Sequence, residues 1–142
     1  DLVFSIEARL RASANTGPSS LTKKELSILS EWQVVCHRSR HFNEELIAHQ
    51  ERIGGVEIDL LFRGRNASAH WSLIEVKSRS DDLWDYGPAV SNRQKQRYLR
   101  VLSLLKERFK AQIDAQIAVV CHNERRYLDP EIRYFELGES LY

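Results

Sequence analysis

The sequence predicts an α/β fold in which a mixed central β-sheet of about five strands is flanked by helices. Residues 56–62 alternate between apolar and charged side chains over most of their length, which is the two-residue period of a β-strand. Residues 90–109 repeat apolar side chains at the spacing of an amphipathic helix. Such segments follow one another in the order α-α-β-β-β-α-β-β, and this order is typical of a mixed sheet with helices on its faces.

Two helices are expected before the first strand. Apolar residues recur at helical spacing over about residues 3–12. Thr22 with Glu25 three residues later is the pattern of a capping box, which predicts a second helix over about residues 22–38. Residues 34–36 (Val-Val-Cys) could instead be a strand, so the end of this helix stays open.

The expected strands are short apolar or alternating segments bounded by turn residues. The turn at Gly54-Gly55 and a hairpin between the second and third strands follow from this pattern. A polar, aromatic loop is expected at residues 81–88, and the last strand is expected at the sheet edge. The strands cover about residues 46–48, 56–62, 71–77, 117–120 and 132–137.

Residues 1–142 have the size of one domain, with a helix and loop at 1–19 before a core at 20–142. No apolar run approaches the roughly 20 residues of a membrane helix, and a secretory signal pattern is missing, so no membrane association is expected. Cys36 and Cys121 fit a reducing compartment, which predicts a cytoplasmic protein. Because the sequence contains no methionine, even at position 1, we expect it to be a trimmed or renumbered piece.

Three charged residues inside the apolar hairpin form the main candidate site. Glu75 and Lys77 are two residues apart on one strand, so their side chains point to the same face. Asp59 comes near Glu75 if the hairpin pairs as expected. Two neighbouring carboxylates are unfavourable without a cation, and Mg²⁺ prefers oxygen ligands, so the pair is expected to hold Mg²⁺, or Mn²⁺ in its place. The backbone carbonyl of Val76 is a further candidate ligand, and Lys77 would orient a metal-bound water and stabilise charge on a phosphate.

The alternative is a solvated sheet face with ion pairs across the strands. The very apolar surroundings of the three charges favour a site instead, because burying charges requires a partner or a metal.

Residues 55–61 (GVEIDLL) and 73–79 (LIEVKSR) together resemble the PD-(D/E)XK nuclease superfamily, most closely its YraN-like family of small bacterial proteins classed as endonucleases. Residues 95–97 (Lys-Gln-Arg) match a basic cluster of that family, and the resemblance covers about residues 31–138. It implies a restriction-endonuclease-like core and Mg²⁺-dependent hydrolysis of DNA phosphodiester bonds, with branched or damaged DNA as candidate substrates. Junction resolvases of this superfamily act as homodimers, which makes a homodimer one option here.

The resemblance also implies roles for single residues. Asp59 and Glu75 would hold the metal, and Lys77 would serve catalysis. Relatives add an acid on the first helix of the core, for which Glu31 is favoured over Glu25, because the capping box already explains Glu25.

RecB-type members carry a Gln-x-x-x-Tyr motif, which Gln94 and Tyr98 match. One helical turn places both on one side, where they would hold the lysine strand or the substrate. The alternative is that Tyr98 belongs to the core and Gln94 to the surface.

Basic residues are concentrated in residues 93–110, although the net charge of the chain is only +1. The arginines near Gln94 are expected to contact phosphates, and the alternative is a solvated outer face. A second possible function for the whole chain is a catalytically silent module that binds nucleic acid or a partner. The residues predicted to bind nucleic acid are Arg79, Arg93, Gln94, Lys95, Arg97 and Tyr98.

Overall fold

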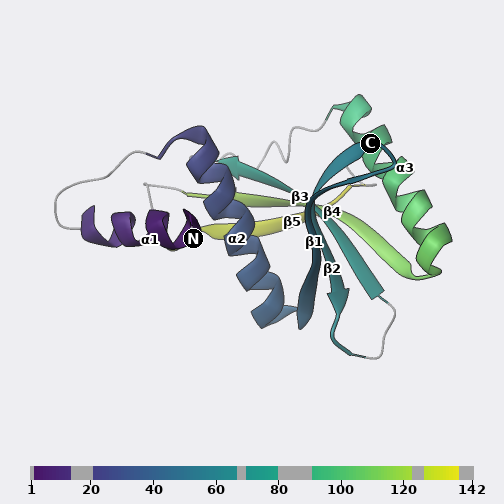
Figure 1. Ribbon diagram of the computed structural model, residues 1–142, viewed down its shortest axis with the longest axis horizontal. Coiled ribbons are helices and arrows are strands. Elements are labelled where there is room, and N and C mark those ends of the chain that lie inside the picture. The colour runs from purple at the N-terminus through teal and green to yellow at the C-terminus, as the bar shows by residue number, and fades with distance from the viewer. Residues whose placement is uncertain (1, 14–20, 67–69, 80–90, 123–126, 138–142) are drawn as a thin grey trace.

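The computed structural model describes the chain except for residues 1, 14–20, 67–69, 80–90, 123–126 and 138–142 (Figure 1). All the strands in the described part form one sheet, in the order β1-β2-β3-β4-β5. Neighbouring strands are antiparallel except β3 and β4, which are parallel and connected through α3. The elements are α1 (Leu2–Ser13), α2 (Lys23–His41), β1 (Glu44–Ile53), β2 (Val56–Gly64), β3 (His70–Arg79), α3 (Asn92–Phe109), β4 (Gln112–Cys121) and β5 (Glu131–Glu136). The predicted α/β class is therefore confirmed: a mixed five-stranded sheet is flanked by helices.

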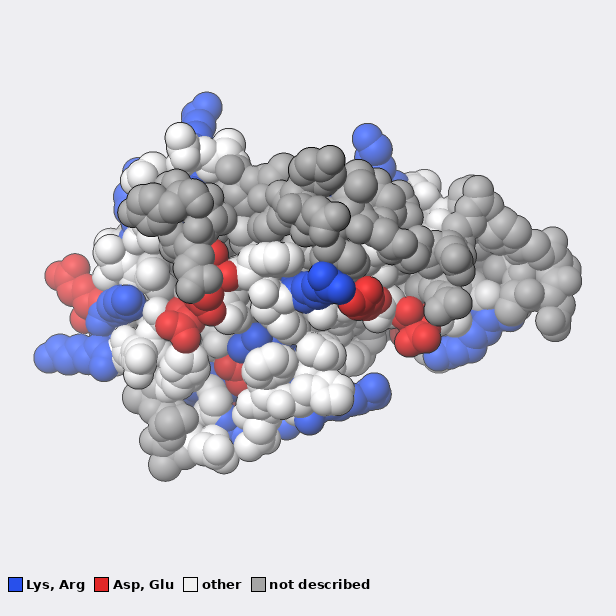
Figure 2. Space-filling view, turned by 180° about the vertical axis from the view of Figure 1, so that it is seen from behind, with Lys and Arg blue, Asp and Glu red and all other residues white. Residues whose placement is uncertain are grey.

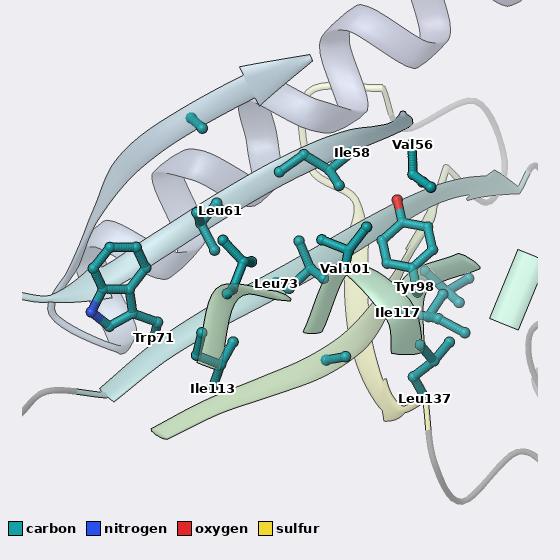
Figure 3. Packing of buried hydrophobic residues seen from close by; sticks show 14 residues of the cluster. Val56, Ile58, Leu61, Trp71, Leu73, Tyr98, Val101, Ile113, Ile117 and Leu137 are labelled. Atoms are coloured by element: carbon teal, nitrogen blue, oxygen red, sulfur yellow. The ribbon is translucent and has the colours of Figure 1, made fainter. Parts of the chain in front are cut away.

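The helices α2 and α3 cover opposite faces of the sheet (Figure 1). Val34 of α2 packs in a cluster with Ile74 of β3. Tyr98 and Val101 of α3 pack in the other cluster, which contains Leu73 of β3 (Figure 3). Because successive side chains of a strand point to opposite faces, β3 contributes to both clusters. Each fully buried aliphatic side chain stabilises the fold by roughly 1.5–3 kcal/mol.

The helix α2 begins with the predicted capping box. The Thr22 hydroxyl accepts a hydrogen bond from the Glu25 amide at 3.1 Å, and Glu25 Oε1 accepts one from the Thr22 amide at 3.0 Å. The helix continues to His41, so the alternative of a strand at residues 34–36 is wrong. On its outer side, α2 contacts Ile6 of α1 through Leu29.

The strand β1 is longer than the pattern predicted: it covers Glu44–Ile53 rather than residues 46–48 alone. Most of its added residues are polar and exposed, because β1 is an edge strand, and such residues give no alternating signal. A bulge between Leu46 and Ala48 shifts the register by one residue. The predicted turn at Gly54-Gly55 is confirmed, and both glycines have positive φ.

The other predicted strands are present with different bounds: the strand predicted at 117–120 is the longer Gln112–Cys121, and the one predicted at 132–137 is Glu131–Glu136. The predicted helix at 90–109 begins at Asn92, after the capping residue Ser91. The predicted loop at 81–88 lies outside the described residues. None of the described helices is both long and apolar enough to cross a membrane.

Candidate active site

The hairpin of β2 and β3 opens where the candidate residues lie. Its backbone pairing ends at Leu60 and Ile74, and Asp59 and Glu75 are the next residues on each strand. The Val76 amide donates a hydrogen bond to Asp59 Oδ2 at 2.9 Å. The carboxylate of Asp59 thus continues the contact between the two strands and lies beside the strand that carries Glu75.

Glu75 is held by two side chains of α3. Gln94 Nε2 donates to Glu75 Oε1 at 2.7 Å, and the Tyr98 hydroxyl donates to Glu75 Oε2. Burial, followed by the charge of Glu75, raises the pKa of Tyr98 far above its usual range, so its hydroxyl stays a proton donor. The predicted one-turn spacing of Gln94 and Tyr98 is therefore confirmed, and both hold the acid of the lysine strand. Lys77 Nζ also lies 3.5 Å from Glu75 Oε1.

Glu31 approaches this cluster from α2. Its side chain is buried, and its negative charge contributes to the raised pKa of Asp59. Burial raises the pKa of Glu31 itself. The Glu25 carboxylate instead accepts the hydrogen bond of the helix cap. Of the two helix acids considered from the sequence, Glu31 is therefore the one near the cluster.

The acidic groups of this cluster outnumber the basic ones. Among the described residues, the charged groups that act on Asp59 are the acids Glu75 and Glu31 and one cation, Lys77. Burial, and then the charge of Glu75, raises the pKa of Asp59 to about 7, and the Val76 amide opposes this rise. A divalent cation would relieve the repulsion.

The cluster offers a few oxygen ligands rather than a complete protein cage, and this is the kind of site that Mg²⁺ uses. Among the residues that the structure describes, no three His, Cys, Asp or Glu side chains form a cation site. A cation here would take its oxygen ligands from Asp59 and Glu75 and complete its shell with water or phosphate, which is the usual Mg²⁺ arrangement. The carbonyl of Val76 stays a predicted ligand.

Two serines that the sequence did not single out connect the elements that carry the acids. Ser78 Oγ donates to Ser30 Oγ at 2.7 Å, and Ser30 Oγ is hydrogen bonded to His122 Nε2 at 3.0 Å. Ser30 precedes Glu31, and Ser78 follows Lys77, so this bond fixes α2 against β3 beside the cluster. The only signal in the sequence is that each serine is adjacent to a candidate site residue.

Lys95 differs from its prediction as a phosphate contact. Its side chain is only 2% exposed, so its ammonium group does not reach a bound phosphate, and this prediction is wrong. It lies three residues before the buried Tyr98, and this spacing places it on the buried side of α3. Arg93 and Arg97 are exposed, as phosphate contacts must be, whereas Arg79 is half-buried at the end of β3.

The described part of the face in Figure 2 carries basic and acidic side chains interspersed rather than a basic patch. On that face, charge alone therefore does not mark a path for nucleic acid. The exposed arginines of α3 stay predictions based on their position near Gln94.

The sequence matches no protein-family profile, and a search of curated proteins finds no match. Two examples of similar solved structures are a DNA complex and a Ca²⁺ complex. A complex of EndoMS with double-stranded DNA has 16% identity, 71% coverage of this chain and a TM-score of 0.43. SfsA of Pyrococcus furiosus in complex with Ca²⁺ has 15% identity, 80% coverage and a TM-score of 0.35. The chain spans 37% of the first protein and 61% of the second. Likeness at this level identifies no family, so the YraN-like assignment stays a prediction.

Proposed function

We propose that this chain is a Mg²⁺-dependent endonuclease that hydrolyses phosphodiester bonds of DNA. The observation that carries the proposal is the cluster of Asp59, Glu75 and Lys77 at the open end of the hairpin. Its excess of buried acids favours a divalent cation, and its lysine favours a phosphate. The motif resemblance supports DNA as the substrate, and branched or damaged duplexes are the first substrates to test.

Each side chain has a task that follows from its contacts. Asp59 accepts the Val76 amide through Oδ2, so Oδ1 is the oxygen that can turn to a cation. Gln94 and Tyr98 fix both oxygens of Glu75, which keeps this carboxylate from rotating away. When bound, Mg²⁺ supplies a more acidic water and neutralises phosphate charge.

Lys77 has the position of a group that acts on the phosphate. Its side chain is 32% exposed while its Nζ stays 3.5 Å from Glu75, so it can reach an oxygen of an incoming phosphodiester. There the ammonium group orients the attacking water and stabilises the negative charge that grows in the transition state.

Substitution of Lys77 tests the proposal. Lys77→Ala should lower the rate of Mg²⁺-dependent DNA cleavage by about 100-fold or more, because one preorganised charge is removed from the transition state. Cleavage should be measured on branched, mismatched and fully paired duplexes, with Lys106→Ala as an exposed lysine control on α3.

One result would remove a part of the proposal, and another would reject it as a whole. Full activity of Lys77→Ala would exclude the role given to this lysine. A native chain that binds DNA, takes up no divalent ion and cuts no duplex would instead be a binding module.

A further inference from the structure

The edge strand β1 has an unusual backbone at the position opposite the candidate site. Gln50 has a φ of +53°, a left-handed conformation that residues with a Cβ rarely adopt. His49 pairs with Leu60, and Glu51 pairs with Ile58, so Gln50 lies opposite Asp59. A strained residue inside a strand persists only where its surroundings hold it, and such residues concentrate at functional sites.

The side chain of Gln50 contacts the acid that α2 contributes. Gln50 Nε2 donates a hydrogen bond to Glu31 Oε1. His49 Nε2 lies 3.6 Å from the same oxygen, where it forms an ion pair when protonated but lies beyond hydrogen-bond distance, and its side chain is 53% exposed. Both contacts are made to Oε1, which leaves Oε2 as the oxygen that can turn to a cation or its water. The geometry therefore distinguishes Gln50 from its neighbour His49.

The surroundings of this contact explain why a donor is needed there. Glu31 is buried, and a buried carboxylate without a hydrogen-bond donor is unfavourable. Glu31 and Gln50 line a cavity of about 490 Å³ between α2 and β1, together with His49 and Leu60. Without the amide, the Glu31 side chain has room to turn into this cavity and away from Asp59.

We propose that Gln50 is a positioning residue for the divalent-cation site. Its left-handed backbone directs the amide to Glu31, and the amide holds that carboxylate toward Asp59 and Glu75, where it would support a bound divalent ion. This inference rests on the proposed function, because it assumes that the cluster binds a divalent ion. Sequence patterns gave no sign of it, since Gln50 lies outside the short strand expected at residues 46–48.

This role is tested by titrating the protein with Mn²⁺ in the absence of DNA, so that ion binding is measured without cleavage. Gln50→Gly removes the amide, and the relief of the left-handed backbone offsets part of the stability lost with the hydrogen bond to Glu31, so the chain should still fold. We expect the Kd for Mn²⁺, measured by calorimetry, to rise about tenfold, which is typical for a residue that orients a metal-binding group. Arg52→Ala is the control on the same strand, because the exposed Arg52 side chain contacts the carbonyl of Gly55 rather than Glu31, and it should change the Kd by less than about twofold.

A double-mutant cycle shows whether Gln50 acts through Glu31. In a Glu31→Gln background, Gln50→Gly should change the Mn²⁺ affinity no further, whereas independent effects would multiply. Gln50→Gly with native Mn²⁺ affinity, or fully additive effects in the cycle, would overturn the inference and leave the proposed function standing. A native chain that binds no Mn²⁺ would overturn both, so the two failures are distinguishable.

Discussion

Two groups of buried charges lie at opposite ends of the same hairpin, and their charges are compensated differently. At the closed end, Arg38 Nε donates to Glu44 Oε1 at 2.5 Å, and both side chains are about 95% buried. Ser72 donates to the other oxygen of Glu44 at 2.8 Å and accepts from Arg38 at 3.0 Å. At the open end, two further acids, Glu75 and Glu31, act on Asp59, and Lys77 is the one cation among the described residues that does so. The first group is neutral without a ligand, and the second is not.

This difference separates a structural role from a functional one. The guanidinium group of Arg38 has further partners in Gln116 at 3.2 Å and in the ring of Phe42, 4.0 Å away, so its burial is compensated within the protein. In the candidate site, the carboxylates outnumber the cations that act on Asp59, so part of their negative charge has no partner among these groups. Buried charges that a fold leaves uncompensated therefore indicate a ligand, whereas compensated ones indicate packing.

Removal of Arg38 should have the largest effect on stability. Arg38→Ala leaves the Glu44 carboxylate buried without the guanidinium group that pairs with it. This should lower the free energy of unfolding by about 3–5 kcal/mol. Chemical denaturation followed by circular dichroism measures this change. A loss below about 1 kcal/mol would show that the closed end is not the structural group described here.

In the metal-free protein, removal of the Asp59 carboxylate should raise the free energy of unfolding, whereas removal of Arg38 lowers it. Because the pKa of Asp59 is raised to about 7 in the folded state, ionisation opposes folding, and this penalty grows as the pH rises from about 4 to 7. Asp59→Asn keeps an acceptor for the Val76 amide and should raise stability at pH 8 by about 1 kcal/mol or more.

The gain from Asp59→Asn should disappear below about pH 4, where native Asp59 is protonated in both states. Denaturation curves in a chelating buffer at pH 4 and pH 8 measure the difference. A loss of stability at pH 8 would mean that the folded protein already compensates the charge of Asp59.

Removal of single exposed arginines should have the smallest effect, and it compares the two ends as DNA contacts. Arg97→Ala should reduce the slope of log K for DNA binding against log salt concentration by about one, which corresponds to one lost phosphate contact. Arg63→Ala at the closed end should leave this slope unchanged. Arg63 is exposed and paired with Glu45 at 2.5 Å. Fluorescence anisotropy at several salt concentrations gives both slopes. Equal slopes for the two variants would contradict the assignment of DNA to the open end.

The sequence predicted the parts of the site that depend on local spacing. Glu75 and Lys77 share a face because they are two residues apart on a strand, and Gln94 and Tyr98 share one because they are a turn apart on a helix. The choice of Glu31 over Glu25 followed from recognising the helix cap. These relations lie within a single helix, a single strand or one hairpin, so the spacing of residues along the sequence is enough to predict them.

The parts that the sequence did not predict depend on contacts between elements. Gln50 reaches Glu31 from an edge strand whose polar residues carry no period. The bond between Ser30 and Ser78 connects a helix and a strand 48 residues apart. Lys95 was misassigned because its burial depends on how α3 is rotated against the rest of the protein, which the spacing of basic residues does not reveal.

Diffraction from a crystal soaked with Mn²⁺ tests the cation site most directly, because manganese gives an anomalous signal that locates the ion. We expect one strong peak at the open end of the hairpin, with carboxylate oxygens of Asp59 and Glu75 at roughly 2.0–2.4 Å from the ion. Soaked crystals without a peak between these two residues, or with the ion held elsewhere, would contradict the assignment of this cluster as a metal-dependent active site.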